Sequence, residues 1–243
     1  MELNDLRVLV TGATAGIGRE TAKLFARRGA TVVVTGRNDE RGEQTVAAIV
    51  AEGGQAAFLA ADMNDVESVR QLADQVGDVD VLVNDAAVFP FAPTLLQDIE
   101  SFEMMFDVNV RLSFFLTAAL LPKMIARGYG AIVNVSTAAA SASLAEAPVY
   151  AATKAALESL TRSWAAALGP NGIRVNAVAP GLSHTDMANA MLGDGVEKMG
   201  AQTPLGRTAK PAEIAEASVF LASPQASYVT GAIVAVDGGY GTR

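Results

Sequence analysis

A chain of 243 residues, of which 51% are hydrophobic and 18% charged, is large enough to bury a substantial core and suits one soluble domain. Its net charge of -8 argues against general nucleic-acid binding and against attachment to an anionic membrane surface. The absence of cysteine excludes disulfides and thiolate chemistry, and the single histidine, His184, leaves little material for a zinc site, so no metal is expected.

Nothing in the sequence predicts export or a membrane span. The first residues, MELNDLRVLVTG, lack the long apolar core of a signal peptide. The apolar stretch FFLTAALLPKMIA is cut by Pro122 and Lys123, so no uncharged apolar run is expected to reach membrane-spanning length. A cytoplasmic soluble protein without a membrane partner is therefore expected.

Short β-branched runs alternate along the chain with longer stretches of helical character. Strands are predicted at 7–11, 31–35, 56–60, 79–84, 130–136, 173–179 and 232–237. Helices are predicted at 17–28, 39–52, 65–76, 98–127, 149–168 and 211–222. The strands are continuous apolar runs, which is typical of a parallel sheet covered on both faces. This order predicts a doubly wound α/β fold.

The least regular segment is 182–210, which contains glycine, proline and three methionines. A long irregular excursion inside a compact domain is often a lid or a binding loop. Methionine would suit an adaptable apolar pocket there. Alternatively, Met187 and Met191 lie four residues apart and serve only in packing.

A glycine-rich turn directly follows the first predicted strand. Gly12, Gly16 and Gly18 follow the pattern G-x-x-x-G-x-G, and a predicted helix begins immediately after them. Glycine permits a tight turn and close backbone approach, so that the N–H groups at the helix N-terminus face a pyrophosphate. The strand–glycine–helix context favours dinucleotide binding over a plain tight turn.

The end of the second predicted strand indicates which dinucleotide is bound. A site selective for NAD usually has an acidic residue there to bind the ribose hydroxyls. In this chain Gly36 takes that place and Arg37 follows, and a guanidinium can pair with the 2′-phosphate of NADP. NADP(H) is therefore favoured over NAD(H), although Asp39 and Glu40 lie close by.

Asp62 and Met63 follow the third predicted strand, where they are candidates for contact with the adenine. Asp62 has a second interpretation, because an aspartate at this place also suits the N-cap of the next helix.

One tyrosine and one lysine stand out in the alanine-rich helix predicted at 149–168. Tyr150 and Lys154 are four residues apart, and this spacing places both side chains on one helical face. A nearby ammonium stabilises a phenolate and would lower the tyrosine pKa from about 10. The alternative is an ordinary pair on a surface helix.

Taken together, these features resemble the classical short-chain dehydrogenase/reductase family over essentially the whole chain. The resemblance rests on the order and separation of "TGATAGIG", Asn84 in "LVNDAA", Asn109 in "DVNV", "IVNVST", "YAATK", "PGLSHT" and "VTGAIVAVDGG". It implies a single Rossmann-type domain over 1–243 with a seven-stranded parallel sheet flanked by helices. It also implies a homo-oligomer, a tetramer or a dimer, built through the long helices and the C-terminal strand.

The resemblance also implies residue roles. Tyr150 would exchange a proton with the substrate oxygen, Lys154 would hold the nicotinamide ribose, and Asn109 would position a water in a proton relay. Charge left on an alkoxide by hydride transfer needs such a poised acid and aimed donors. The implied cofactor-binding residues are Gly12, Thr14, Gly16, Ile17, Gly18, Arg37, Asp62, Met63, Asn84, Ala86, Tyr150, Lys154, Pro180, Gly181 and Thr185. His184 is interpreted as a loop residue.

The chain departs from the family pattern at two places. Where the family pattern has N-N-A-G, this chain has Asn84-Asp85-Ala86-Ala87, so the final glycine is replaced. Asp85 puts in doubt whether this segment supports the sheet or the site as it does in the family. The position of the usual catalytic serine is occupied by Thr137. Threonine still offers a hydroxyl donor, but its β-branch adds a methyl group and fixes χ1. Ser136 lies one residue earlier and would point to the opposite face of a regular strand.

These observations predict an NADP(H)-dependent oxidoreductase that acts on a ketone or a secondary alcohol, with Tyr150 as acid and base. A 3-oxoacyl-carrier-protein reductase is the first alternative, but Gly128 and Asn171 occupy positions where those reductases tend to carry arginine, which favours a free small molecule. The second alternative is a weakly catalytic dinucleotide sensor or scaffold, because a fold does not fix a function.

Overall fold

The computed structural model, which describes residues 3–242, contains one seven-stranded parallel sheet. The strand order is β3-β2-β1-β4-β5-β6-β7, as predicted for a doubly wound sheet. Its members are β1 (Arg7–Thr11), β2 (Thr31–Gly36), β3 (Gln55–Ala60), β4 (Val81–Asn84), β5 (Gly130–Val135), β6 (Ile173–Pro180) and β7 (Ile233–Val236). The order reverses between β1 and β4, and ligands of such sheets bind in the crevice at the carboxyl ends of the strands beside this point.

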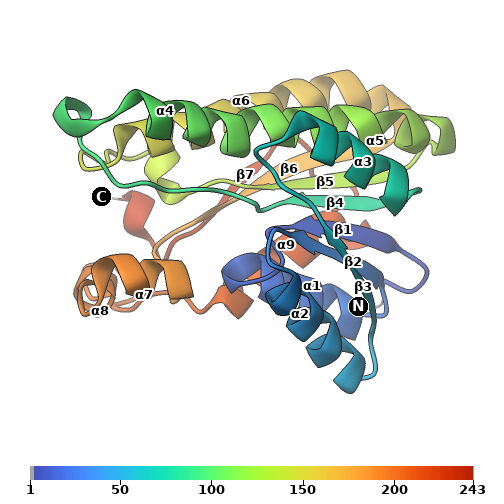
Figure 1. Cartoon of the computed structure of the whole chain (residues 1–243), viewed down its shortest axis with the longest axis horizontal. Coiled ribbons are helices and arrows are strands. Elements are labelled where there is room, and N and C mark those ends of the chain that lie inside the picture. Colours follow the sequence, from blue (N-terminus) through green and yellow to red (C-terminus); the bar gives the residue numbers. More distant parts are fainter. Residues whose placement is uncertain (1–2, 243) are drawn as a thin grey trace.

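Helices cover both faces of the sheet (Figure 1). One layer consists of α1 (Gly16–Arg27), α2 (Asp39–Ala51) and α9 (Pro211–Ala222). The opposite layer consists of α3 (Val66–Val76), α4 (Ile99–Phe106), α5 (Ser113–Arg127) and α6 (Pro148–Leu168). Each layer packs a separate apolar core against the sheet, and this explains why the strands are apolar on both faces.

The segment 182–210 is more ordered than predicted. It contains two short helices, α7 (Asp186–Leu192) and α8 (Gly195–Gly200), which lie beyond one end of the sheet (Figure 1). The Thr185 side chain caps α7 by accepting a hydrogen bond from the N–H of Ala188 (3.1 Å). Helices of seven and six residues span too few turns to produce a recognisable apolar periodicity, so the sequence did not reveal them.

The predicted long helix at 98–127 is present, with one irregularity. Between α4 and α5 the residues Asp107–Leu112 form a π-helical turn, so that the helix runs from Ile99 to Arg127. Single π-turns inside α-helices often mark functional sites. This turn carries Asn109, a predicted catalytic residue.

The same helix bears on the expectation that no segment spans a membrane, although no uncharged run within it reaches 18 residues. Its most apolar 18-residue window has a mean hydropathy of 1.5, so by length and composition the helix is able to cross a membrane. However, 44% of the window is buried inside the protein, and Leu112, Leu116 and Leu120 pack into the core beside α3. A single helix of this kind is weak evidence for a membrane span, since core helices of soluble proteins share these properties.

Candidate active site

The glycine-rich turn lies in the crevice between the carboxyl ends of β1 and β4. Gly12 has φ +69°, and a Cβ atom there would lie 2.9 Å from the main chain of Ala86. A Cβ at Gly18 would lie 2.6 Å from the carbonyl oxygen of Gly12. The turn therefore requires glycine at both positions, because its backbone is packed against the β4 loop and against itself.

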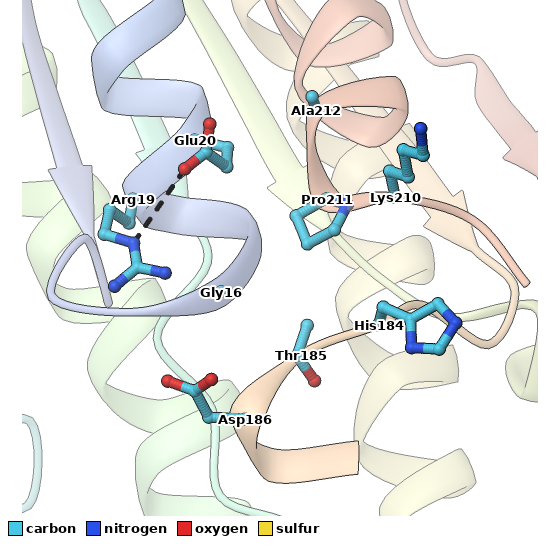
Figure 2. Close-up of a pocket in the computed structure, with 9 residues that line it drawn as sticks. All are labelled: Gly16, Arg19, Glu20, His184, Thr185, Asp186, Lys210, Pro211 and Ala212. Carbon is cyan, nitrogen blue, oxygen red and sulfur yellow. Dashed lines mark ion pairs between the residues drawn. The ribbon is translucent and has the colours of Figure 1, made fainter. Parts of the chain in front are cut away.

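A cavity of about 320 Å³ opens beside this turn (Figure 2). α1 begins at Gly16, and its N-cap, Ala15, provides no side-chain cap, so the N-terminus of this helix suits an anion. Thr185 faces Gly16, where a Cβ atom would lie 3.3 Å from the threonine methyl. The cavity is lined by Gly16, Arg19, Glu20, His184, Thr185, Asp186, Lys210, Pro211 and Ala212.

This cradle fits the diphosphate of a dinucleotide. It combines a helix N-terminus, a backbone without side chains at the turn and two cationic side chains, Arg19 and Lys210. Thr14 and Ile17 belong to the same turn, and Ile17 packs against the core and anchors the start of α1. The sequence pattern did not single out Arg19 or Lys210, because they meet only through the packing of α1 beside α9.

At the tip of β2 a side chain in place of Gly36 would crowd Thr14. A Cβ atom at Gly36 would lie 2.6 Å from the methyl carbon of Thr14. Arg37 follows, is exposed and forms no hydrogen bond or ion pair within residues 3–242. Asn38 caps α2, so that Asp39 and Glu40 belong to the first turn of that helix.

Asp62 and Met63, the two candidates for adenine contact at the end of β3, lie in different environments. Asp65, not Asp62, caps α3 by accepting from the N–H groups of Glu67 (3.0 Å) and Ser68 (3.2 Å), so the capping interpretation of Asp62 is wrong. Asp62 accepts from the N–H of Asn64 (2.9 Å) with one oxygen and is exposed at the crevice side of the sheet. The Met63 side chain is buried in the core, which leaves only its main chain for contact with a cofactor.

The side chain of Asn84 forms hydrogen bonds inside the sheet and does not point into the crevice. Its Nδ2 donates to the side chains of Asn134 (2.9 Å) and Thr117 (3.3 Å) in the buried layer under α5. The N–H groups of Asp85 and Ala86 both donate to Thr11 Oγ1 at 3.0 and 3.1 Å. The β4 loop is thus tied to β1, and cofactor binding by Asn84 stays a prediction for its main chain alone.

Tyr150 and Lys154 are neighbours at the crevice end of α6. The Lys154 ammonium is buried, donates to the carbonyl oxygen of Val135 (2.7 Å) and lies 5.9 Å from the centroid of the Tyr150 ring. The ring of Phe89 packs against the Tyr150 ring with a centroid distance of 4.0 Å. Phe89 is a site residue that the sequence did not suggest, since only tertiary packing brings the β4 loop onto α6.

The pKa of Tyr150 shifts opposite to expectation in this structure. Burial raises the pKa of its phenol, and the negative charge of Asp85 raises it further. Burial lowers the pKa of Lys154 to about 8, although Asp85 acts in the opposite direction. The expected lowering of the Tyr150 pKa is therefore not found, because removal of water around the ring disfavours the phenolate.

Asp85 should make stability depend on pH. Burial raises the pKa of its carboxyl from 3.8 to about 7, although the charge of Lys154 lowers it. The folded chain then holds a proton that the unfolded chain releases, so stability falls as pH rises from about 4 towards 7. Relative to Asp85→Asn, the urea midpoint of the wild type should decrease over this range. A difference between the two midpoints that stays constant with pH would contradict the prediction.

Thr137, rather than Ser136, presents its hydroxyl near the end of β5. Ser136 is buried, and its Oγ donates to the Glu158 carboxylate (2.8 Å) on α6. Thr137 is partly exposed, and its Oγ1 accepts from the N–H of Ala139 (3.3 Å), which leaves the hydroxyl hydrogen free to donate. The opposite directions of these two side chains follow from the alternation along an extended strand.

Asn109 is fully buried in the π-turn. Its Nδ2 donates to Thr153 Oγ1 (3.1 Å) and to the carbonyl of Val88 (3.0 Å), and its Oδ1 accepts from the N–H of Val88 (2.9 Å). The side chain therefore fastens the β4 loop to α6. If Asn109 positions a water, it must use the main-chain carbonyl of the π-turn, because its amide group is already satisfied.

The segment after β6 closes the other side of the crevice. Pro180 ends β6, and the N–H of Gly181 donates to the carbonyl of Val236 (3.0 Å), so both residues lie at the carboxyl end of the sheet. His184 Nε2 lies 3.0 Å from the Glu197 carboxylate, which agrees with its interpretation as a loop residue. Met187 and Met191 on α7 are 49% and 37% exposed, so they do not serve merely as core packing.

Comparison with known proteins identifies the family. The family model described as enoyl-(acyl carrier protein) reductase matches residues 12–241. A cis-4-hydroxycyclohexanecarboxylate dehydrogenase of Sinomonas cyclohexanicum is 41% identical over 96% of this chain and 95% of its own length. A 3-oxoacyl-[acyl-carrier-protein] reductase of Thermotoga maritima is 35% identical over 98% of this chain and 99% of its own.

Solved structures agree with these relatives. A short-chain dehydrogenase/reductase family protein is 52% identical with a TM-score of 0.95, and the match covers 100% of both chains. A gluconate 5-dehydrogenase of Burkholderia cenocepacia, solved with NADP and tartrate, is 31% identical with a TM-score of 0.94 over 100% of this chain and 97% of its own. A 7α-hydroxysteroid dehydrogenase complexed with NADH is 37% identical with a TM-score of 0.94 over 98% of this chain and 95% of its own. The chain therefore belongs to the short-chain dehydrogenase/reductase family and is a nicotinamide-dependent oxidoreductase that acts on CH–OH groups.

Proposed function

We propose that this enzyme prefers NADP(H) and interconverts a free, small secondary alcohol and its ketone. The observation that carries the proposal is the Tyr150–Lys154 pair, in which the buried ammonium lies 5.9 Å from the ring centroid and donates to Val135 at the end of β5, two residues before Thr137. In this proposal α6 supplies the proton-exchanging group, the residue after β5 supplies a hydrogen-bond donor, and the N-terminus of α1 binds the diphosphate. The cofactor preference rests separately on the tip of β2.

Each residue has a definite task in this reaction. When bound, the cofactor supplies or accepts the hydride. The Tyr150 hydroxyl donates a proton to the substrate oxygen during reduction and accepts it during oxidation. The Thr137 hydroxyl donates a hydrogen bond to the same oxygen, where negative charge develops. Lys154 presents a buried ammonium beside Tyr150 and would bind the nicotinamide ribose hydroxyls.

The preference for NADP(H) is supported by the contrast between Gly36 and Arg37. Position 36 is a glycine and so offers no carboxylate to select NAD(H), and the guanidinium at position 37 has no partner among the side chains of residues 3–242. A charged hydrogen bond to a 2′-phosphate contributes about 1.5–3 kcal/mol. NAD(H), which lacks this phosphate, gains nothing from Arg37.

Arg37→Ala should therefore reduce kcat/KM for NADPH by about 10- to 100-fold and leave kcat/KM for NADH nearly unchanged. The measurement is steady-state kinetics with both cofactors at one ionic strength. Arg70→Ala is the matched control, since Arg70 is an exposed arginine on α3 that pairs with Glu67 on its own helix. Equal losses with both cofactors would contradict the assignment of Arg37 to the 2′-phosphate.

The scarcity of free arginine at the positions considered for carrier binding favours a free small substrate over a carrier-bound one. Gly128 ends α5 with φ +70°, a left-handed conformation that disfavours an arginine, and Asn171 is uncharged. The neighbouring Arg127 donates to the carbonyl of Val79 and pairs with Asp80, so it is not presented to a carrier protein. The ring of Phe89 packs against Tyr150, the ring of Phe91 packs against Phe89, and the two phenyl rings would form an apolar wall for the substrate.

Two assays separate the alternatives. Cyclic secondary alcohols are the first compounds to test, because the relative from Sinomonas is named for one. A 3-oxoacyl-carrier-protein reductase, favoured by the relative from Thermotoga, would prefer the carrier-bound substrate to its free thioester analogue. NADPH binding without turnover across both sets would indicate a sensor.

We also propose that the enzyme is a cytoplasmic homo-oligomer, a tetramer or a dimer. Phe102, Phe114 and Phe115 are 39–44% exposed on the helix formed by α4 and α5, and Phe114 packs against Trp164 of α6. Exposed aromatic patches of this kind typically bind a second subunit. Sedimentation velocity measures the assembly, and a monomer at micromolar concentration would contradict the proposal.

A further inference from the structure

Val88, in the loop after β4, is hydrogen-bonded at both of its main-chain polar groups by one side chain. Its N–H donates to Asn109 Oδ1 (2.9 Å), and its carbonyl oxygen accepts from Asn109 Nδ2 (3.0 Å). Asn109 is fully buried in the π-turn, where water does not compete for these two bonds. The backbone just before Phe89 is therefore fastened to the long helix.

Thr153 continues this attachment onto α6. Its Oγ1 accepts from Asn109 Nδ2 (3.1 Å), the nitrogen that also donates to Val88, and donates its own hydrogen to the carbonyl oxygen of Tyr150 (2.7 Å). Thr153 is fully buried. A hydroxyl can accept and donate at the same time, whereas an apolar side chain of the same shape can do neither. The hydroxyl of Thr153 thus joins the β4 loop to the residue that carries the reactive phenol.

The aromatic side chains of the same two segments are in contact. The ring of Phe89 lies against the ring of Tyr150 with a centroid distance of 4.0 Å and an interplanar angle of 38°. Two connections therefore join these residues, the ring contact and the hydrogen-bonded chain through Asn109 and Thr153. Because the chain is buried, the backbone of Phe89 cannot withdraw from Tyr150 without leaving polar groups unpaired.

We propose that Thr153 is a positioning residue that keeps the Phe89 ring against Tyr150 through this hydrogen-bonded chain. In its fixed position Phe89 determines specificity, because it restricts the enzyme to substrates with little bulk beside the reacting carbonyl. A fixed apolar wall of this kind discriminates by about 10-fold or more against one additional methyl group. The limit on substrate size rests on the proposed function, since Phe89 faces the substrate only if Tyr150 is the acid and base.

The first test measures specificity with a ketone and its methylated analogue, and cyclohexanone with 2-methylcyclohexanone is the first pair. The wild type should prefer cyclohexanone in kcat/KM, and Phe89→Leu should reduce this preference by about 3- to 10-fold, mainly through a lower KM for the methylated ketone. Thr153→Val keeps the shape of threonine but loses both hydrogen bonds, so it should reduce the preference in the same direction. Thr153→Ser keeps the hydroxyl and should retain the wild-type preference. An unchanged preference in Phe89→Leu or in Thr153→Val would overturn the inference.

Thr161→Val is the matched control for Thr153→Val. Thr161 is also fully buried on α6, about two turns further along the helix. Its Oγ1 donates to the carbonyl oxygen of Leu157 (2.8 Å) and accepts from Asn134 Nδ2 (2.8 Å), so it has the same two roles but holds the sheet instead of the β4 loop. Both valine variants should lose stability against urea, but only Thr153→Val should change the preference. Equal changes in preference would overturn the positioning role.

A second test needs no turnover. In protein labelled with 3-fluorotyrosine, the ¹⁹F signal of Tyr150 is assigned by its absence in Tyr150→Phe, and Phe89→Leu gives its position without the neighbouring ring. The signal in Thr153→Val should move towards that position, whereas Thr153→Ser should keep the wild-type signal. A signal that does not move in Thr153→Val refutes the positioning role whatever the activity. If the signal moves as expected but the wild type reduces no ketone, the proposed function fails and the positioning of Phe89 by Thr153 stands.

Discussion

Tyr150→Phe should reduce kcat by about 10²- to 10⁴-fold, because the ring remains in place and only the proton-exchanging hydroxyl is removed. The ring packs between Phe89 and the Lys154 ammonium, and neither contact needs the hydroxyl. NADPH absorbance with a responsive ketone measures turnover, and cofactor fluorescence measures binding. The dissociation constant of NADPH should change little, so the loss appears in kcat.

The matched control for this variant is Tyr228→Phe, because Tyr228 is fully exposed on the loop before β7. It should retain wild-type turnover. If Tyr150→Phe keeps more than about a tenth of the wild-type kcat, Tyr150 is not the acid and base of the reaction. In that case the proposed division of tasks is wrong even though the family assignment stands.

Thr137→Val is expected to reduce kcat by about 10²- to 10³-fold, as does the loss of one donor to a developing oxyanion in other enzymes. Valine keeps the shape and the β-branch of threonine, so the variant removes the hydroxyl and little else. Thr137→Ser keeps the donor and should stay within a few-fold of wild type. The measurement is kcat for ketone reduction with each variant.

Ser136→Ala distinguishes the two neighbouring hydroxyls. Ser136 donates to Glu158 inside the protein, so its loss should affect stability more than turnover. A valine variant at position 137 with wild-type kcat, or an alanine variant at position 136 without activity in a folded protein, would assign the donor to Ser136. Circular dichroism shows whether each variant is folded.

Sequence alone determined the sheet and the cofactor end of the site. Continuous apolar runs specify strands buried on both faces, and the seven predicted strands lie within two residues of the observed ones. The glycine spacing located the turn at Gly12, and the helical period placed Tyr150 beside Lys154. All these features depend on residues close together in the chain, where local geometry and hydrophobic periodicity act.

Tertiary structure decided how the site is tuned. It placed Phe89 on Tyr150, turned the Asn84 side chain into the sheet, introduced the π-turn at Asn109 and packed the Asp85 carboxylate beside Gly18. It also gave the Tyr150 pKa a direction opposite to the one expected from Lys154 alone. A pKa depends on how much water the surrounding chain removes and on charges from remote segments, and neither quantity is written in local sequence.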